Sequence, residues 1–153
     1  MLHIVLVEPE IPANTGNISR TCVITNTALH LVRPLGFSTD DKHLKRAGLD
    51  YWPYLTLYYH DSIEEVMERY SDHRFFFCTT KCRNRHSDTK FRDEDFLVFG
   101  KETKGLPETL LHSHWDQCIR IPMQTTTRSL NLSNSVAIVL YEALRQIDYP
   151  GLV

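Results

Sequence analysis

A turn rich in hydrogen-bonding side chains precedes the last predicted helix of the chain. Ser129, Asn131, Ser133 and Asn134 all fall between residues 129 and 134. A helix N-terminus leaves its first N–H groups unpaired and carries a partial positive charge, so one Ser, Thr, Asn or Asp side chain is enough to cap it. The excess of such residues favours a ligand-binding turn, and a generously capped structural helix is the alternative.

Two further polar segments follow predicted strands. Residues 8–20 contain Asn14, which can cap the following helix, and Arg20, which lies nearly two turns inside that helix and carries a planar fork suited to phosphate. Residues 99–107 contain Gly100 and Gly105, which allow a tight turn or a close approach to a ligand. Their spacing matches neither a dinucleotide-binding fingerprint nor a Walker loop, so neither type of nucleotide site is indicated.

The elements that must position these segments alternate along the chain. We expect strands at residues 2–7, 28–32, 54–59, 74–78, 96–99 and 117–121, and helices at residues 15–25, 41–47, 62–70, 108–112 and 132–147. This alternation predicts an α/β fold with a mostly parallel sheet flanked by helices. Ligands of such sheets bind at the carboxyl ends of the strands, where the three polar segments lie.

Length and composition narrow the class of protein. The chain has 153 residues, of which 42% are hydrophobic, and we expect a single domain spanning residues 1–153. The sequence has no apolar run long enough to span a membrane and no signal peptide, so we expect a cytoplasmic protein without a membrane partner. Cys78, Cys82 and His86 lack a fourth ligand at a sensible spacing, so no metal site is predicted.

Charge gives only a local hint of a nucleic-acid partner. The net charge is -2, so any RNA-binding surface must be confined to part of the molecule. Lys42 and Arg46 belong to one short basic cluster, and Arg83 and Arg85 belong to another. We expect these four side chains to contact RNA phosphates, and an ordinary solvated face is the alternative for each cluster.

These segments together resemble the SPOUT superfamily of RNA methyltransferases, in particular its TrmH-like branch. The chain is most similar to the TrmL (YibK) family of tRNA (cytidine/uridine) 2'-O-methyltransferases, which act on the wobble nucleotide. The resemblance rests on residues 8–17 with Arg20, on residues 48–51, on the Gly100 and Ser129 segments and on residues 141–146, and so covers nearly the whole chain. It implies a C-terminal deep trefoil knot, S-adenosyl-L-methionine as the cofactor, no metal, and a homodimer.

The resemblance also implies the substrate. It would be the anticodon stem-loop of tRNA, methylated on the ribose of cytidine or modified uridine at position 34, with leucine tRNAs as expected substrates. The alternatives are 2'-O-methylation of another tRNA or rRNA nucleotide, a non-catalytic RNA-binding module, and a metabolic enzyme with a small-molecule substrate.

Individual site residues follow from the same resemblance. The catalytic centre would contain Arg20, Asn14, Glu102, Ser129 and Asn131. The cofactor pocket would be lined by Cys78, Thr79, Gly100, Glu102, Gly105, Ile121, Met123, Ser129 and Leu130. Such a set offers mostly apolar and backbone contacts, which suit an adenine ring.

Arg20 is the residue that we expect to contribute most to the chemistry. A guanidinium with a pKa above about 12 is scarcely ever neutral, so Arg20 is poorly suited to act as a general base. We expect it to anchor the target phosphate and to stabilise the developing alkoxide, and the proton acceptor stays open.

Two cysteines depart from the family pattern. Cys78 replaces an apolar residue and should pack as a small hydrophobe. Cys82 stands where glycine is common, so the backbone would be strained if that position needs an angle that only glycine tolerates.

Overall fold

The computed structural model describes residues 1–48, 51–126 and 129–153, so residues 49 and 50 of the expected 48–51 motif lie outside the described part. Its elements are, in chain order, β1 (His3–Val7), α1 (Pro12–Ile24), β2 (Ala28–Val32), α2 (Lys42–Gly48), β3 (Leu57–His60), α3 (Ile63–Arg69), β4 (Phe75–Cys78), β5 (Phe96–Phe99), α4 (Glu108–Ser113), β6 (Cys118–Ile119) and α5 (Leu132–Gln146). Short 3-10 turns occupy Trp52–Tyr54, His86–Asp88 and Trp115–Gln117. The longest described helix, α5, has 15 residues, and none of the described helices is long and apolar enough to cross a membrane.

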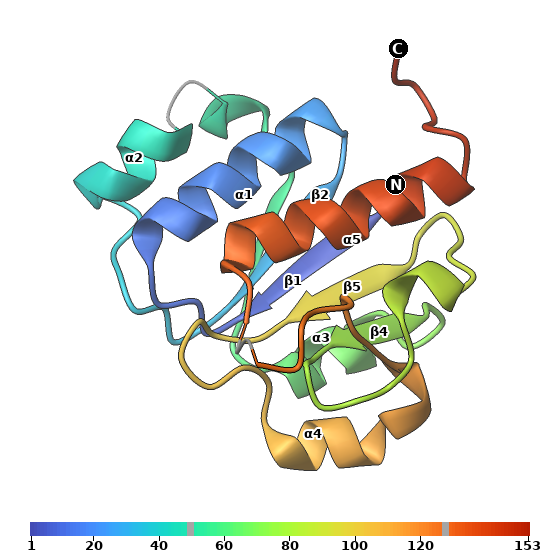
Figure 1. The fold of residues 1–153 in the computed structure, drawn as a ribbon. Helices are drawn as coiled ribbons and strands as arrows, with labels where there is room; N and C mark the ends of the chain where they lie inside the picture. The colour runs from blue at the N-terminus through green and yellow to red at the C-terminus, as the bar shows by residue number, and fades with distance from the viewer. Residues whose placement is uncertain (49–50, 127–128) are drawn as a thin grey trace.

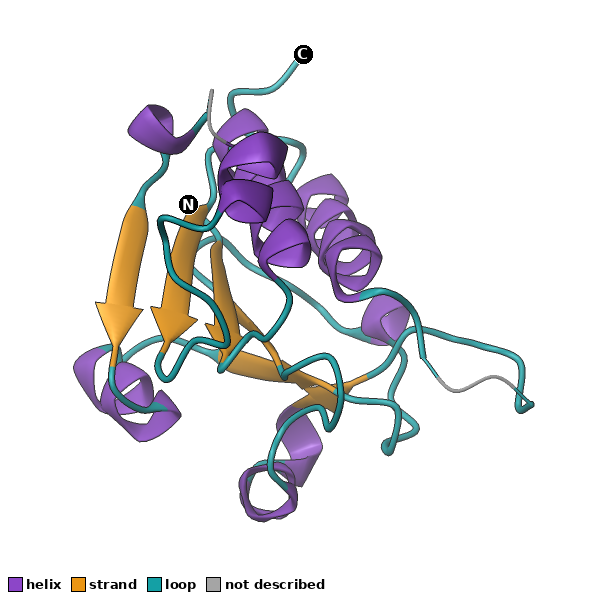
Figure 2. Cartoon of the chain, turned by 90° about the vertical axis from the view of Figure 1, so that its left-hand side faces the viewer, coloured by secondary structure: helices purple, strands orange, loops and turns teal. Residues whose placement is uncertain are grey.

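The strands form one sheet of six parallel strands in the order β3-β2-β1-β5-β4-β6. β1 and β5 are therefore the central pair (Figure 1). Figure 2 shows helices on both sides of the twisted sheet. The predicted α/β class with a parallel sheet is confirmed, and all loops that leave the strands at their carboxyl ends meet along one edge.

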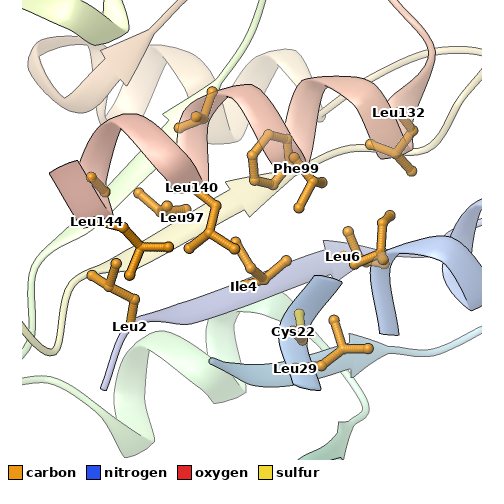
Figure 3. Packing of buried hydrophobic residues seen from close by; sticks show 14 of the residues in the cluster. Leu2, Ile4, Leu6, Cys22, Leu29, Leu97, Phe99, Leu132, Leu140 and Leu144 are labelled. Atoms are coloured by element: carbon orange, nitrogen blue, oxygen red, sulfur yellow. The ribbon is translucent and has the colours of Figure 1, made fainter. Parts of the chain in front are cut away.

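Both faces of the central strands are buried, so residues 4–7 of β1 and Phe96–Phe99 of β5 are continuously apolar rather than alternating. On one face Ile4, Leu6 and Leu97 pack against Leu140 and other apolar residues of α5, as Figure 3 shows. The opposite face packs against the apolar residues of α3 and α4. The sheet is thus fixed from both sides, which gives its carboxyl edge a rigid base.

Two elements start three residues away from their predicted positions, and the last strand, expected at residues 117–121, is only Cys118–Ile119. The third strand begins at Leu57 rather than at residue 54, because Trp52–Tyr54 forms a 3-10 turn in which the Leu55 N–H bonds to the carbonyl of Trp52. The first helix begins three residues early, at Pro12, where the missing N–H and fixed φ of proline are well tolerated. The expected capping role of Asn14 is therefore wrong, because this residue lies inside the first turn.

The two unusual cysteines are accommodated differently from one another. Cys78 is partly buried and packs against the larger core cluster, as expected for a small hydrophobe. Cys82 is buried, and its φ angle is not positive. The backbone strain considered for this position therefore does not occur.

Candidate active site

A cavity of about 610 Å³ opens at the carboxyl edge of the sheet. It is bordered by the segments that follow β4, β5 and β6 and by the start of α5. All nine residues expected to hold the cofactor line it, namely Cys78, Thr79, Gly100, Glu102, Gly105, Ile121, Met123, Ser129 and Leu130. The topology therefore gathers residues that are up to 52 positions apart in the sequence around one space of suitable size for a cofactor.

The glycines of the β5 loop have two separate roles. A Cβ atom on Gly100 would lie 2.1 Å from the carbonyl carbon of Gly105, because the loop folds back on itself and the Gly105 N–H bonds to the Lys101 carbonyl at 2.9 Å. Gly105 has φ +68°, and a Cβ there would meet no atom within 4 Å. The expected tight turn is thus present: Gly100 is needed for its close approach to the backbone of the same loop, and Gly105 for its backbone angle. The approach of either glycine to a ligand stays a prediction.

The thiol of Cys78 contributes an uncharged wall to the cavity. Burial raises the pKa of this thiol to about 12, so it stays protonated at neutral pH. A neutral thiol is weakly polar and behaves as a small apolar group. Together with Ile121, Met123 and Leu130, it gives the cavity an apolar surface against which a flat ring can pack.

Three polar side chains join the N-terminal segment, the β5 loop and the start of α5. The Glu102 carboxylate accepts hydrogen bonds from the Glu10 and Ile11 N–H groups at 2.8 Å each and from Asn14 Nδ2 at 3.1 Å. Asn14 Oδ1 in turn accepts from Asn131 Nδ2 at 3.0 Å. Asn131 Oδ1 accepts from the Ser133 N–H at 2.9 Å and so caps α5. We call Glu102, Asn14 and Asn131 the amide relay.

The chemistry of the amide relay fixes the orientation of each of its members. A carboxylate only accepts, so Asn14 must present its NH₂ to Glu102 and its carbonyl to Asn131. The Glu102 carboxylate receives three hydrogen bonds and so holds the N-terminal segment against the β5 loop. Asn131 caps the helix, so the capping interpretation of the polar turn is confirmed. Asn131 also borders the cavity, and ligand binding by the turn stays a prediction.

Arg20 lies apart from the other expected catalytic residues. Its side chain is exposed on α1, where Nη2 is 3.1 Å from the Tyr51 hydroxyl and the guanidinium is 4.8 Å from the centre of the Tyr51 ring. It is six residues beyond Asn14, about 9 Å along the helix axis, and does not line the cavity. The structure brings Asn14, Glu102, Ser129 and Asn131 together and leaves Arg20 outside.

The two basic clusters lie on different parts of the molecule. Lys42 and Arg46 belong to α2, which packs on α1, whereas Arg83 and Arg85 follow β4 next to the edge strand β6. Arg85 pairs with Asp88 at 2.8 Å. A single chain therefore does not combine the four side chains into one patch.

Sequence reasoning missed some residues of this edge. The cavity is also lined by Thr80, Lys81, Leu132 and Ser135. The only sequence feature that could have indicated them is their position, directly after a strand or at the start of a helix. Arg120 was also missed. Its Nη1 donates to the Thr80 carbonyl at 3.1 Å and thereby holds the turn that follows β4.

The fold is an α/β sheet with a cavity at its carboxyl edge, and the loops around that cavity lack the phosphate-binding glycine fingerprint of dinucleotide-binding proteins. The chain belongs to the SpoU rRNA Methylase family, whose model matches residues 1–141.

Relatives and solved structures agree with this family. The tRNA (cytidine(34)-2'-O)-methyltransferase of Escherichia coli strain K12 is 49% identical, and the match covers 100% of this chain and 98% of the relative. A structure described as "Structural insights into the 2-OH methylation of C/U34 on tRNA" superposes with a TM-score of 0.92 at 44% identity and covers 97% of each chain. The SpoU methyltransferase AviRb from Streptomyces viridochromogenes, solved in complex with AdoMet, shares the fold with a TM-score of 0.86 at 24% identity, over 97% of this chain and 61% of its own.

Proposed function

We propose that this protein transfers a methyl group from S-adenosyl-L-methionine to the ribose 2'-hydroxyl of the wobble nucleotide of tRNA, cytidine or uridine at position 34. The observation that carries the proposal is that all nine expected cofactor residues line one cavity at the carboxyl edge of the sheet. Membership of a methylase family and the activity named for the E. coli relative support it.

The cavity residues divide into two functional groups. The apolar wall formed by Cys78, Ile121 and Leu130 would hold the adenine ring, and the folded loop between Gly100 and Gly105 would offer backbone groups to the rest of the cofactor. S-adenosyl-L-methionine, when bound, supplies a methyl group on a positively charged sulfur. The amide relay would keep the three loops at fixed spacing, so that the 2'-oxygen and the methyl group meet in line.

We further propose that Arg20 acts on the RNA rather than on the cofactor. Its exposed position outside the cavity agrees with a guanidinium that holds the target phosphate and stabilises the developing alkoxide. The Tyr51 hydroxyl and ring limit the directions in which it can point. Ser129, which lines the cavity and is exposed, is placed to meet the incoming ribose.

We also infer a single domain with the C-terminal trefoil knot, acting as a cytoplasmic homodimer on the anticodon stem-loop. The Arg120 backbone is bonded on both sides to the 84–86 loop, and Gln146 of α5 bonds to Thr89 and Phe91 of the same segment, which supports a threaded chain. The helices α1 and α5 expose three large apolar side chains, Ile24, Ile138 and Tyr141. Their exposure supports a protein interface on this side of the molecule. Sedimentation tests the homodimer, and a stable monomer that still methylates tRNA would contradict it.

Single-turnover methyl transfer to tRNA, with both substrates saturating and the product nucleotide mapped, tests the proposal. The parent protein should methylate the ribose at position 34, and Arg20→Ala should abolish transfer while cofactor binding persists. Arg20→Lys should restore little, because an ammonium cannot reproduce a bidentate fork. Arg69→Ala, an exposed arginine on α3, is the matched control and should leave the rate unchanged.

Two results would contradict the proposal in different ways. If the methyl-transfer rate of Arg20→Ala stayed within about tenfold of the parent rate, the barrier would have changed by only about 1.4 kcal/mol, and Arg20 would not be a catalytic residue. Binding of tRNA by the parent protein without methyl transfer to any nucleotide would identify a non-catalytic RNA-binding module instead.

A further inference from the structure

Two histidines and a glutamate meet at the amino-terminal edge of the sheet, across the sheet from the cavity. His3 begins β1, His73 lies just before β4 and Glu94 lies just before β5, and these three strands are neighbours in the order β1-β5-β4. His3 Nε2 is 3.2 Å from Glu94 Oε2, and His73 Nε2 is 3.7 Å from the same oxygen. The three atoms all lie within 4.8 Å of one another.

The other ring nitrogen of each histidine already has a partner. His73 Nδ1 is 2.9 Å from a carboxylate oxygen of Asp72, and His3 Nδ1 is 3.0 Å from His30 Nε2. Metal-ligating histidines typically have their second nitrogen held in this way, which fixes the ring and its tautomer. Since the Asp72 carboxylate only accepts, His73 Nδ1 donates to it, and Nε2 is the ring atom that faces Glu94. The Nε2 atoms of both histidines and Glu94 Oε2 therefore converge on one point, where a cation would lie.

Packing holds the two imidazole rings in place. The His3 ring stacks on Phe96 with ring centres 4.1 Å apart and an interplanar angle of 3°, and it meets the His73 ring edge-on at 5.9 Å. His3 is buried, so the packing around its ring leaves the ring little freedom to turn. The Met1 amino group lies 2.9 Å from Glu94 Oε1 and so leaves Oε2 directed at the histidines.

We propose that His3, His73 and Glu94 bind a divalent transition-metal ion of the zinc type, with water completing the coordination. Two nitrogens and a carboxylate oxygen form a common zinc ligand set, and tetrahedral bonds of about 2.0–2.1 Å place ligand atoms about 3.4 Å apart. The distances of 3.2 and 3.7 Å lie on either side of this value. Because the site joins the starts of three neighbouring strands, far from the cavity, the ion would stabilise the fold and would take no part in methyl transfer.

Zinc titration by calorimetry tests the site, using full-length protein with an unmodified N-terminus and no histidine tag. The parent should bind one Zn²⁺ per chain with a micromolar dissociation constant, and Co²⁺ in its place should give visible absorption bands of a low-symmetry site. His73→Ala and Glu94→Gln should each weaken zinc binding at least about tenfold, as loss of a ligand requires. His112→Ala, a histidine on α4 far from the cluster, is the matched control and should bind like the parent.

Thermal unfolding supplies a second readout. Zinc at about 100 times its dissociation constant should raise the Tm of the parent on the order of 5 °C and leave the Tm of His73→Ala unchanged. If His73→Ala fails to fold, His73→Gln, which can still donate to Asp72, replaces it. Absence of zinc binding at about 1 mM, or equal binding by the parent and both ligand variants, would overturn the proposal.

Discussion

Replacing Asn14 by aspartate is the sharpest test of the amide relay. The substitution exchanges one NH₂ donor for an oxygen without a change of size. Asn14 Nδ2 lies 3.1 Å from Glu102 Oε2, and Asn14 itself is only 5% exposed, so the variant would place two carboxylates in hydrogen-bond contact where water has little access. Two such groups can coexist there only if they share a proton.

The size of the effect follows from that distance. Two unit charges about 3.1 Å apart repel by about 5 kcal/mol at an effective dielectric constant of about 20. Because of this repulsion the folded pair would keep one proton at neutral pH, so the pKa of the pair would be raised above that of a carboxyl group in the unfolded chain. At pH 7 the variant should therefore be about 4 kcal/mol less stable than the parent, a large part of the 5–15 kcal/mol that stabilises a typical domain.

The pH dependence gives the assay its specificity. Above the unfolded pKa of about 4, the folded variant binds one proton more than the unfolded variant, so stability is lost as pH rises. The difference in free energy of unfolding between parent and Asn14→Asp, measured by urea denaturation, should grow by about 1.4 kcal/mol per pH unit between pH 5 and 7.

Asn14→Ala is the matched control, because it removes the same hydrogen bonds without adding a charge. It should destabilise the protein by about 2–4 kcal/mol, and its difference from the parent should not change with pH. A difference for Asn14→Asp that stays flat from pH 5 to pH 8 would refute the contact between Asn14 and Glu102 in solution.

Three further predictions concern the cavity and the RNA surface. Gly100→Ala should weaken S-adenosyl-L-methionine binding at least about tenfold in calorimetry, because a Cβ there would lie 2.1 Å from a backbone carbon. Gly105→Ala should mainly cost about 1 kcal/mol of stability, because the residue has φ +68°. Equal affinities of both variants and the parent would contradict this prediction. The affinity for tRNA should fall steeply with salt, and Lys42→Glu or Arg83→Glu should raise the KM for tRNA without changing cofactor affinity; a flat salt dependence would argue against phosphate contacts. Chelators should leave the methyl-transfer rate unchanged, and a rate restored only by added metal would show that the reaction needs one.

The regular elements were predictable because their causes are local. The apolar run at Phe96–Phe99 defines its strand by composition alone, and the capping serine at Ser62 correctly marks the start of α3 through its bond to the Glu65 N–H. The third strand was predicted three residues too early, because Tyr54 and Leu55 have strand-like side chains but belong to a turn around Pro53. Side-chain preference could not reveal that turn.

The site was predictable only in part. The nine cavity residues came from family resemblance, since periodicity cannot place Cys78 and Leu130 side by side. The role of Asn14 was wrong, because its partners Glu102 and Asn131 are 88 and 117 positions away and a local capping rule considers only near neighbours. The sequence also does not distinguish a glycine needed for space, such as Gly100, from one needed for its backbone angle, such as Gly105.

The hydrogen bond between Asn14 and Asn131 also has a consequence for how the chain is made. It joins the first turn of the first helix to the cap of the last one, so the cavity lacks one of its borders until nearly the whole chain has been synthesised. A nascent chain that ends before residue 131 would have β1, β5 and the glycine loop but not the partner that holds Asn14. Cofactor affinity should therefore arise abruptly, late in synthesis, and contacts so distant in sequence are expected to form slowly.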